Sequence, residues 1–188
     1  MTASTNLADT IVLKAGNAFC ISLPDSDVPA DGEHPLGLYR DDCRFLSVHE
    51  LRIAGVAPRL LVSSAITGAD AVHELTNPEL ELPGGRPLEL QTLQLRVDRQ
   101  LEDEATMLER VHVHLYGRDP VELELEVAVA ADFRAMLALR GLAGVPEPDV
   151  RTSTVDGGLR FAARGGDGVM RATTVTGDPT PVVPDRRG

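Results

Sequence analysis

Alternation of apolar and polar residues is the strongest pattern in the chain. Between residues 121 and 129, Val or Leu occupies every odd position, and three glutamates and Ala128 occupy the even ones. Residues 106–115 show a similar pattern, with His112 and His114 among the polar positions. A period of two is typical of a β-strand with one buried and one solvated face. The two runs therefore predict two half-buried strands.

Turn residues between these runs predict a hairpin from Thr106 to Val129. Tyr116 to Pro120 form the connection, and pairing Leu115 with Val121 places apolar residues opposite one another. A slip of one residue would mix the two faces and is rejected. On the other face, the same register sets basic residues against acidic ones: His114, His112 and Arg110 against Glu122, Glu124 and Glu126.

Further strands are predicted wherever short alternating segments flank turn residues. These segments are Thr10–Leu13, Ala18–Leu23, Phe45–Ile53, Arg59–Ile66, Leu88–Val97, Leu159–Ala163 and Val169–Val175. The first two are predicted to form a hairpin around a tight turn at Ala15, Gly16 and Asn17, and the last two a late hairpin around residues 164–168. The alternation changes phase within Leu88–Val97, which predicts a β-bulge near Gln91 and Thr92. One short helical turn is expected within Ala131–Leu139. The sequence therefore predicts an all-β fold, a single antiparallel β-sandwich with little helix.

Length and composition indicate one soluble domain with an aliphatic core. A chain of 188 residues is long enough for one core and short for two. We expect a flexible N-terminus at residues 1–9, a β-sandwich at 10–176 and a Pro-rich tail or linker start at 177–188. No apolar run reaches the roughly 20 residues of a membrane span, and the start lacks the features of a signal peptide.

The net charge of −11 argues against two classes of partner. Nucleic acids and anionic membranes both require a basic face, so neither is an expected partner. The chain's cysteines, Cys20 and Cys43, do not make a disulfide framework. A reduced, cytoplasmic protein is the expectation.

Few residues suggest chemistry of their own. His112 and His114 share a strand face and could grip a metal ion, but a zinc site needs a third ligand, so no metal or other cofactor is expected. Asp41 and Asp42 could divide acid and base roles in glycoside hydrolysis, although adjacent strand residues point to opposite faces. An Asp–Arg network bracing a turn is the favoured alternative for this pair. Asp132 and Arg140 could form a buried pair or present polar groups to a neighbouring domain.

Two ordered motifs carry a resemblance to a known family. The run Gly37–Ser47, GLYRDDCRFLS, resembles the Gly-aromatic-x-x-Asp-Thr-Arg-x-Leu-Ser signature of an N-terminal domain in bacterial glycogen debranching enzymes of the amylo-α-1,6-glucosidase type. The run Asp132–Gly141, DFRAMLALRG, resembles that domain's Asp-Phe-x-Asp-x-Phe-x-Val-Arg-Gly segment. The resemblance extends from about Val12 to Thr176. Three positions depart from it: Cys43 replaces Thr, Ala135 an acidic residue and Leu137 a phenylalanine.

The resemblance implies a β-sandwich of the supersandwich type that precedes a helical (α/α)-barrel. In such enzymes the barrel carries the catalytic carboxylates and hydrolyses α-1,6 branch linkages, so no catalytic residue is expected in this chain. The family-marked residues Asp42, Arg44, Asp132 and Arg140 are the candidates for a binding or interdomain contact. The expected partners are the downstream barrel and an α-glucan.

Two other functions stay open at this point. A free-standing carbohydrate-binding or protein-interaction module is one, although the scarcity of aromatic residues argues against glycan stacking. A self-sufficient enzyme is the other, and only scattered carboxylates favour it.

Overall fold

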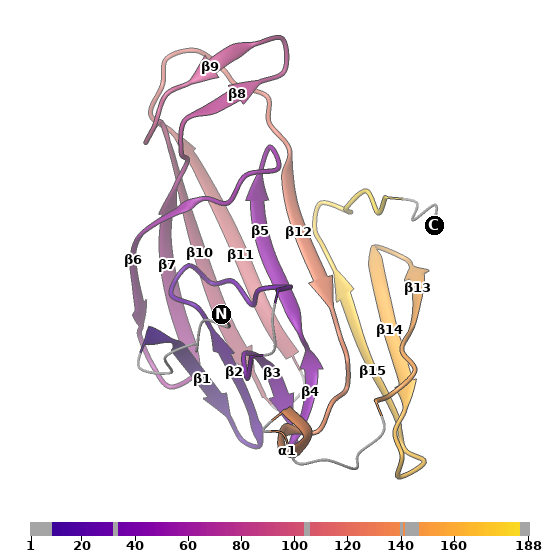
Figure 1. Ribbon diagram of the computed structural model, residues 1–188. Coiled ribbons are helices and arrows are strands. Elements are labelled where there is room, and N and C mark those ends of the chain that lie inside the picture. Colours follow the sequence, from indigo (N-terminus) through magenta and orange to yellow (C-terminus); the bar gives the residue numbers. More distant parts are fainter. Residues whose placement is uncertain (1–8, 32–33, 104–105, 140, 142–146, 185–188) are drawn as a thin grey trace.

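The computed structural model describes residues 9–31, 34–103, 106–139, 141 and 147–184 (Figure 1). These residues form antiparallel strands and one short helix, which confirms the all-β prediction. The strands are β1 (Ile11–Ala15), β2 (Ala18–Ser22), β3 (Gly37–Arg40), β4 (Cys43–Leu46), β5 (Val48–Ile53), β6 (Arg59–Ala65), β7 (Asp70–Thr76), β8 (Leu80–Leu82), β9 (Arg86–Leu88), β10 (Leu93–Glu102), β11 (Thr106–Leu115), β12 (Leu125–Ala130), β13 (Arg151–Val155), β14 (Gly158–Arg164) and β15 (Met170–Thr176). The helix α1 spans Met136–Leu139, inside the predicted helical turn.

The first sheet is a meander in the order β1-β2-β3-β4. Its β1–β2 hairpin closes with Ala15 opposite Ala18, so the predicted turn at Gly16 and Asn17 is confirmed. Beyond Ser47 the chain continues as β5, which pairs with β12. The backbone N–H of Ser47 donates to Ala130 at 2.8 Å and that of Arg44 to Arg134 at 2.9 Å. Residues 43–53 therefore run antiparallel to residues 125–135 along their whole length.

The second sheet has the order β11-β10-β7-β6 and corrects the predicted hairpin. β11 pairs with β10 over its full length, with Val113 opposite Leu95, and β12 pairs with β5. Residues 121–124 lie outside the strands that the structure describes. The prediction of a Thr106–Val129 hairpin was therefore wrong. Alternation identifies the two faces of a strand, and several partners in this chain offer the same alternation.

Two apolar clusters lie between these sheets. Leu51 and Ile53 of β5 pack with Leu75 of β7 and with Leu93, Leu95 and Val97 of β10. Leu13 and Cys20 of the first sheet meet Ala71 and Leu101 of the second. These side chains point inward because they occupy alternate positions of their strands. The hydrophobic core thus attaches β5 and the first sheet to the second sheet.

A third sheet, β13-β14-β15, stands beside β12 and β4 (Figure 1). The predicted late hairpin is confirmed, since β14 pairs with β15 around residues 165–169. Phe161 and Ala163 of β14 pack on Cys43, Ala131 and Phe133 in a separate cluster. The hydroxyl of Thr173 donates to the carbonyl of Phe45 at 2.6 Å. One face of this sheet is therefore attached to the rest of the molecule.

The phase change predicted as a bulge is a turn. The residues from Glu89 to Thr92 separate β9 from β10, and Gln91 adopts a left-handed conformation with φ of 62°. The shift in alternation was located correctly, but it marks the boundary between two strands. No helix among the described residues has the length and apolar character needed to cross a membrane. The expected flexible N-terminus lies outside the described residues except for Asp9, and residues 177–184 of the expected tail carry no strand.

Candidate functional site

Asp41 and Asp42 form the tight turn between β3 and β4. Both have positive φ, 47° and 60°, and Arg40 pairs with Cys43 across them. Positive φ at both central residues is the mark of a type I′ hairpin turn, and aspartate tolerates it better than most residues. The Asp41 carboxylate lies 3.4 Å from the Arg40 guanidinium, and the Asp42 carbonyl accepts a hydrogen bond from the N–H of Met136 at 2.8 Å. The pair braces a turn, as the favoured interpretation expects.

Arg44 directs its guanidinium inward from β4 onto Asp132, 88 residues later in the chain. Nε donates to both carboxylate oxygens, at 3.1 and 3.2 Å, and Nη2 donates to Oδ2. Nη1 donates to the carbonyls of His34 at 2.9 Å and Leu36 at 3.1 Å. The Arg44 side chain is 7% exposed and that of Asp132 is 25% exposed. This bidentate ion pair ties the first sheet to the segment that follows β12.

Gly37 makes room for the Arg44 side chain. A Cβ at residue 37 would lie 2.3 Å from the carbonyl oxygen of Leu46 and 2.7 Å from Cδ of Arg44. Its φ of 141° is also one that residues with a side chain rarely adopt. The nearby ring of Tyr39 is buried, stacks on Phe19 at 4.9 Å and donates its hydroxyl to the carbonyl of Pro35. The first motif therefore encodes a packed corner around one buried arginine.

The electrostatics of this corner favour the charged pair. Burial disfavours a charged guanidinium, but hydrogen bonds from Arg44 to Asp132 and the attraction of that carboxylate outweigh it, so the pKa of Arg44 is raised. Burial raises the pKa of the Cys43 thiol, which donates to the carbonyl of Phe133 at 3.4 Å. Because every nitrogen of the Arg44 guanidinium donates to an internal acceptor, this side chain acts in holding the corner together.

A second buried ion pair lies between the two main sheets. Nε and Nη2 of Arg99 on β10 donate to Oε2 of Glu109 on β11 at 2.9 and 2.6 Å. Nη2 also donates to Nδ1 of His49 on β5 at 3.2 Å, and Nε2 of His49 lies 3.1 Å from Oε1 of Glu109. Since a guanidinium can only donate, His49 accepts at Nδ1 and donates from Nε2. The three side chains close a ring across the core.

This ring stabilises an ionised carboxylate in the interior. Burial alone would raise the pKa of Glu109, but Arg99 and His49 outweigh it and hold that pKa far below the ordinary range of a glutamate. The Arg99 side chain is 1% exposed. Burial raises the pKa of the neighbouring Cys20 thiol and lowers that of His73, whose Nδ1 donates to the carbonyl of Pro24 at 2.8 Å.

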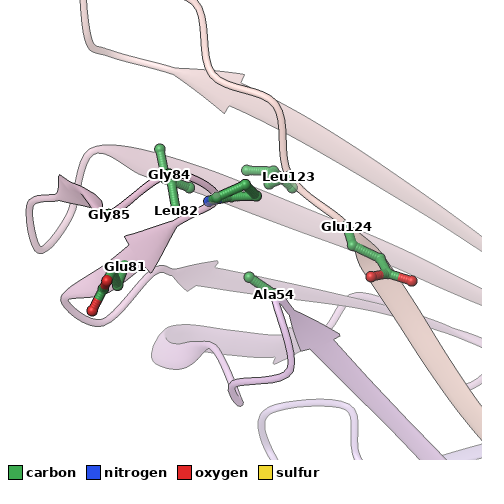
Figure 2. A pocket seen from close by; sticks show the side chains of 8 residues that line it. Ala54, Glu81, Leu82, Gly84, Gly85, Leu123 and Glu124 are labelled. Carbon is green, nitrogen blue, oxygen red and sulfur yellow. The ribbon is translucent and has the colours of Figure 1, made fainter.

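A shallow pocket of about 410 Å³ lies at the far end of the molecule, under the β8–β9 hairpin. Leu82 and Leu123 lie near its centre, and the carboxylates of Glu81 and Glu124 point away from each other at its opposite ends (Figure 2). A pair that hydrolyses a glycosidic bond must face the same bond from two sides. The two glutamates are therefore not arranged for that reaction.

Comparison with known proteins identifies the family. A family model for the N-terminal domain of some glycogen debranching enzymes matches residues 13–188. The chain belongs to this family. Searches among curated proteins and among solved structures returned no significant match.

The predicted site residues of this debranching-enzyme domain fall into three groups. Arg44 and Asp132 meet in the buried pair described above. Asp42 is exposed on the adjoining turn and joins the same corner through its backbone. Arg140 lies outside the described residues. Contact between these residues and a neighbouring domain stays a prediction.

The two strand histidines of the debranching-enzyme domain face different partners from those expected. His112 lies 3.2 Å from Asp98 of β10, and the His114 ring packs against Tyr116 at 4.6 Å. The pairing with Glu122, Glu124 and Glu126 was wrong because β10 occupies the position expected for those residues. Among the described residues, no group of three potential metal ligands surrounds the histidines.

Sequence reasoning missed the Arg99–Glu109–His49 ring. The sequence does carry a signal for two residues of the ring, Arg99 and Glu109. Arg99 continues the inward series Leu93, Leu95 and Val97, and Glu109 lies two positions before Val111. A charge in register with an apolar series predicts a buried ion pair. His49 carries no such signal, because its contact depends on how the sheets pack.

Proposed function

We propose that this chain is a non-catalytic β-domain that packs on the downstream catalytic part of a debranching-type glycosidase. Family membership supplies the enzyme context. The observation that carries the packing role is a set of exposed apolar side chains on β11 and β12. This apolar set consists of Val113, Leu125 and Val127, which are 48%, 40% and 46% exposed.

These three residues point toward the core side of their strands. Leu125 and Val127 lie directly opposite the fully buried Ile53 and Leu51, and Val113 lies opposite the buried Leu95. Opposed residues of paired strands share a face, so the side chains stand at the margin of the core. Apolar groups left accessible in this way are typical of surfaces that another protein part covers. Burial of these residues by the downstream part is the role we infer.

Serine substitutions test this role in two contexts. In the full-length enzyme, L125S/V127S is expected to lower the melting temperature and the activity on α-1,6-branched glucan. In residues 1–188 alone, the same change is expected to have a small effect, because the side chains are already half exposed. V182S is the matched control, since Val182 is 93% exposed in the C-terminal segment. Equal effects in the two contexts would refute the packing role.

Two further measurements separate the alternatives. The isolated chain is expected to release no sugar from α-1,6-linked oligosaccharides, and measurable turnover would identify it as an enzyme in its own right. Calorimetric titration with branched α-glucan tests a carbohydrate-binding module. Saturable heat with the isolated chain would favour that function. We also propose a cytoplasmic location, which the two buried, unpaired thiols Cys20 and Cys43 support.

A further inference from the structure

The outer face of the third sheet carries an unusual concentration of arginines. Strand pairing places Arg151 of β13 opposite Ala162 of β14, and Arg160 of β14 opposite Ser153 of β13. Arg164 follows two positions after Ala162 on the same strand. All three arginines are exposed, and they lie on the face opposite Phe161 and Ala163, which pack inward. We call Arg151, Arg160 and Arg164 the arginine face.

These arginines are close neighbours around a floor of small side chains. Arg151 is the diagonal neighbour of both Arg160 and Arg164, which places its Cβ about 7–8 Å from each of theirs. Ala162 lies between them and faces Ala172 of β15. The three guanidinium groups therefore surround a patch of small side chains that a partner surface can contact.

No carboxylate among the described residues lies within ion-pair distance of the arginine face. Arg164 donates to the backbone carbonyl of Gly168 at 2.9 Å. Carboxylates do contact other arginines, among them Arg44, Arg52, Arg96, Arg99 and Arg171, whereas the arginine face gathers three arginines without such a contact on one side of one sheet. Like charges placed side by side repel, and no carboxylate within the described chain offsets the repulsion among these three arginines. A partner that supplies carboxylates would remove the repulsion.

The charge of the third sheet also opposes that of the remaining chain. Residues 151–176 contain four arginines and two aspartates, whereas the other positions contain fourteen basic and twenty-seven acidic residues. Arginine is enriched at protein interfaces because its planar group binds carboxylates with two parallel hydrogen bonds. The face is flat and outside the pocket, which suits a protein surface better than a small ligand.

We propose that the arginine face docks an acidic surface of the domain that follows it in the same polypeptide. This inference rests on the proposed function. β15 ends at Thr176 and leads directly into residues 177–184, so a following domain is tethered beside this sheet. A short tether gives a high effective concentration, which allows a few charge contacts to hold two domains together. The arginine face orients the contact, and the same domain covers the apolar set of Val113, Leu125 and Val127.

The test uses the full-length enzyme with a protease site inserted in residues 177–184. After folding and cleavage, size-exclusion chromatography measures whether the two parts stay together at about 0.05 M and about 0.5 M salt, since screening strengthens over this range. The triple variant R151E/R160E/R164E is compared with R59E/R110E/R118E. The control changes the net charge equally, at exposed arginines that likewise contact no carboxylate within the described chain. Circular dichroism confirms that each variant is folded.

We expect the wild-type parts to stay together at low salt and to separate at high salt. The arginine-face variant is expected to bind at least about tenfold more weakly, and the control to bind as the wild type does. The neutral variant R151Q/R160Q/R164Q gives the same direction where charge reversal prevents folding. If the parts stay together whichever arginines are changed, the arginine face is refuted and the proposed packing stands. If the wild-type parts separate at low salt, both are refuted.

Discussion

Replacing Glu109 with glutamine removes the only anion from the ring of Arg99, Glu109 and His49. Arg99 keeps its charge in this variant, because a guanidinium is not deprotonated in proteins. Two donated hydrogen bonds, at 2.9 and 2.6 Å, lose their ionised acceptor, and so does the contact from His49 at 3.1 Å. The E109Q chain therefore holds an uncompensated cation in its core.

Breaking a buried pair from one side costs about 3–5 kcal/mol. The free energy of unfolding of a small domain is only about 5–15 kcal/mol, so the loss is a large part of the total. Urea unfolding at pH 7, followed by circular dichroism, measures it. E126Q is the matched control: Glu126 is exposed on β12, and its substitution is expected to change the free energy of unfolding by less than about 0.5 kcal/mol. A loss below about 1 kcal/mol in E109Q would refute the stabilising role of the ring.

The pH dependence of E109Q supplies an independent check. Because the pKa of Glu109 is lower in the folded than in the unfolded chain, its stabilisation is fully present above the unfolded value of about 4.3. It declines as the pH falls below that value. The difference between wild type and E109Q is therefore expected to shrink from pH 5 toward pH 3. R99M/E109L, which removes both charges, is expected to recover part of the stability that E109Q loses.

Two other substitutions and one pH titration test separate parts of the fold. G37A is expected to lower the free energy of unfolding by more than about 2 kcal/mol, because its Cβ would meet Leu46 and Arg44, whereas G68A has open space and is expected to be neutral. D132N is expected to cost about 2–3 kcal/mol by urea unfolding, less than the loss in E109Q because a quarter of the Asp132 side chain is exposed. Burial lowers the pKa of His73, so an NMR titration should find its midpoint below that of an ordinary histidine, and the stability that the neutral ring supports should fall as the pH drops below about 6.5. A midpoint at or above about 6.5 in the folded chain would contradict the third expectation.

Strand positions could be predicted from the sequence much better than strand partners. The alternation around Ala18–Ser22 and Gly158–Arg164 locates strands because the period is a local property of the backbone. A hairpin was predicted correctly where a short turn enforces it, as between the strands on either side of Gly16 and Asn17. It failed for Thr106–Leu115, which has an alternating neighbour on each side in the sequence. The choice of β10 over β12 depends on how the whole core packs, and the alternation near the turn does not encode that choice.

The candidate site was predictable in part for a related reason. The motifs marked Arg44 and Asp132 separately, and the structure joins them across 88 residues. Their separation in sequence hides the pairing, while the glycine at 37 is explained only once the path of the Arg44 side chain is known. The arginine face escaped notice because Arg151, Arg160 and Arg164 come together through strand register.

The two kinds of charge in this domain imply two kinds of mutational effect. Arg44 and Arg99 are buried against carboxylates, so their loss acts inside the chain and is expected to destabilise residues 1–188 by themselves. Arg151 and Arg160 are exposed and contact no carboxylate within the described chain, so their loss leaves every internal ion pair intact. An effect of their substitution must then arise from something outside the domain. Comparing the isolated chain with the full enzyme therefore separates residues that stabilise the domain from residues that act on something outside it.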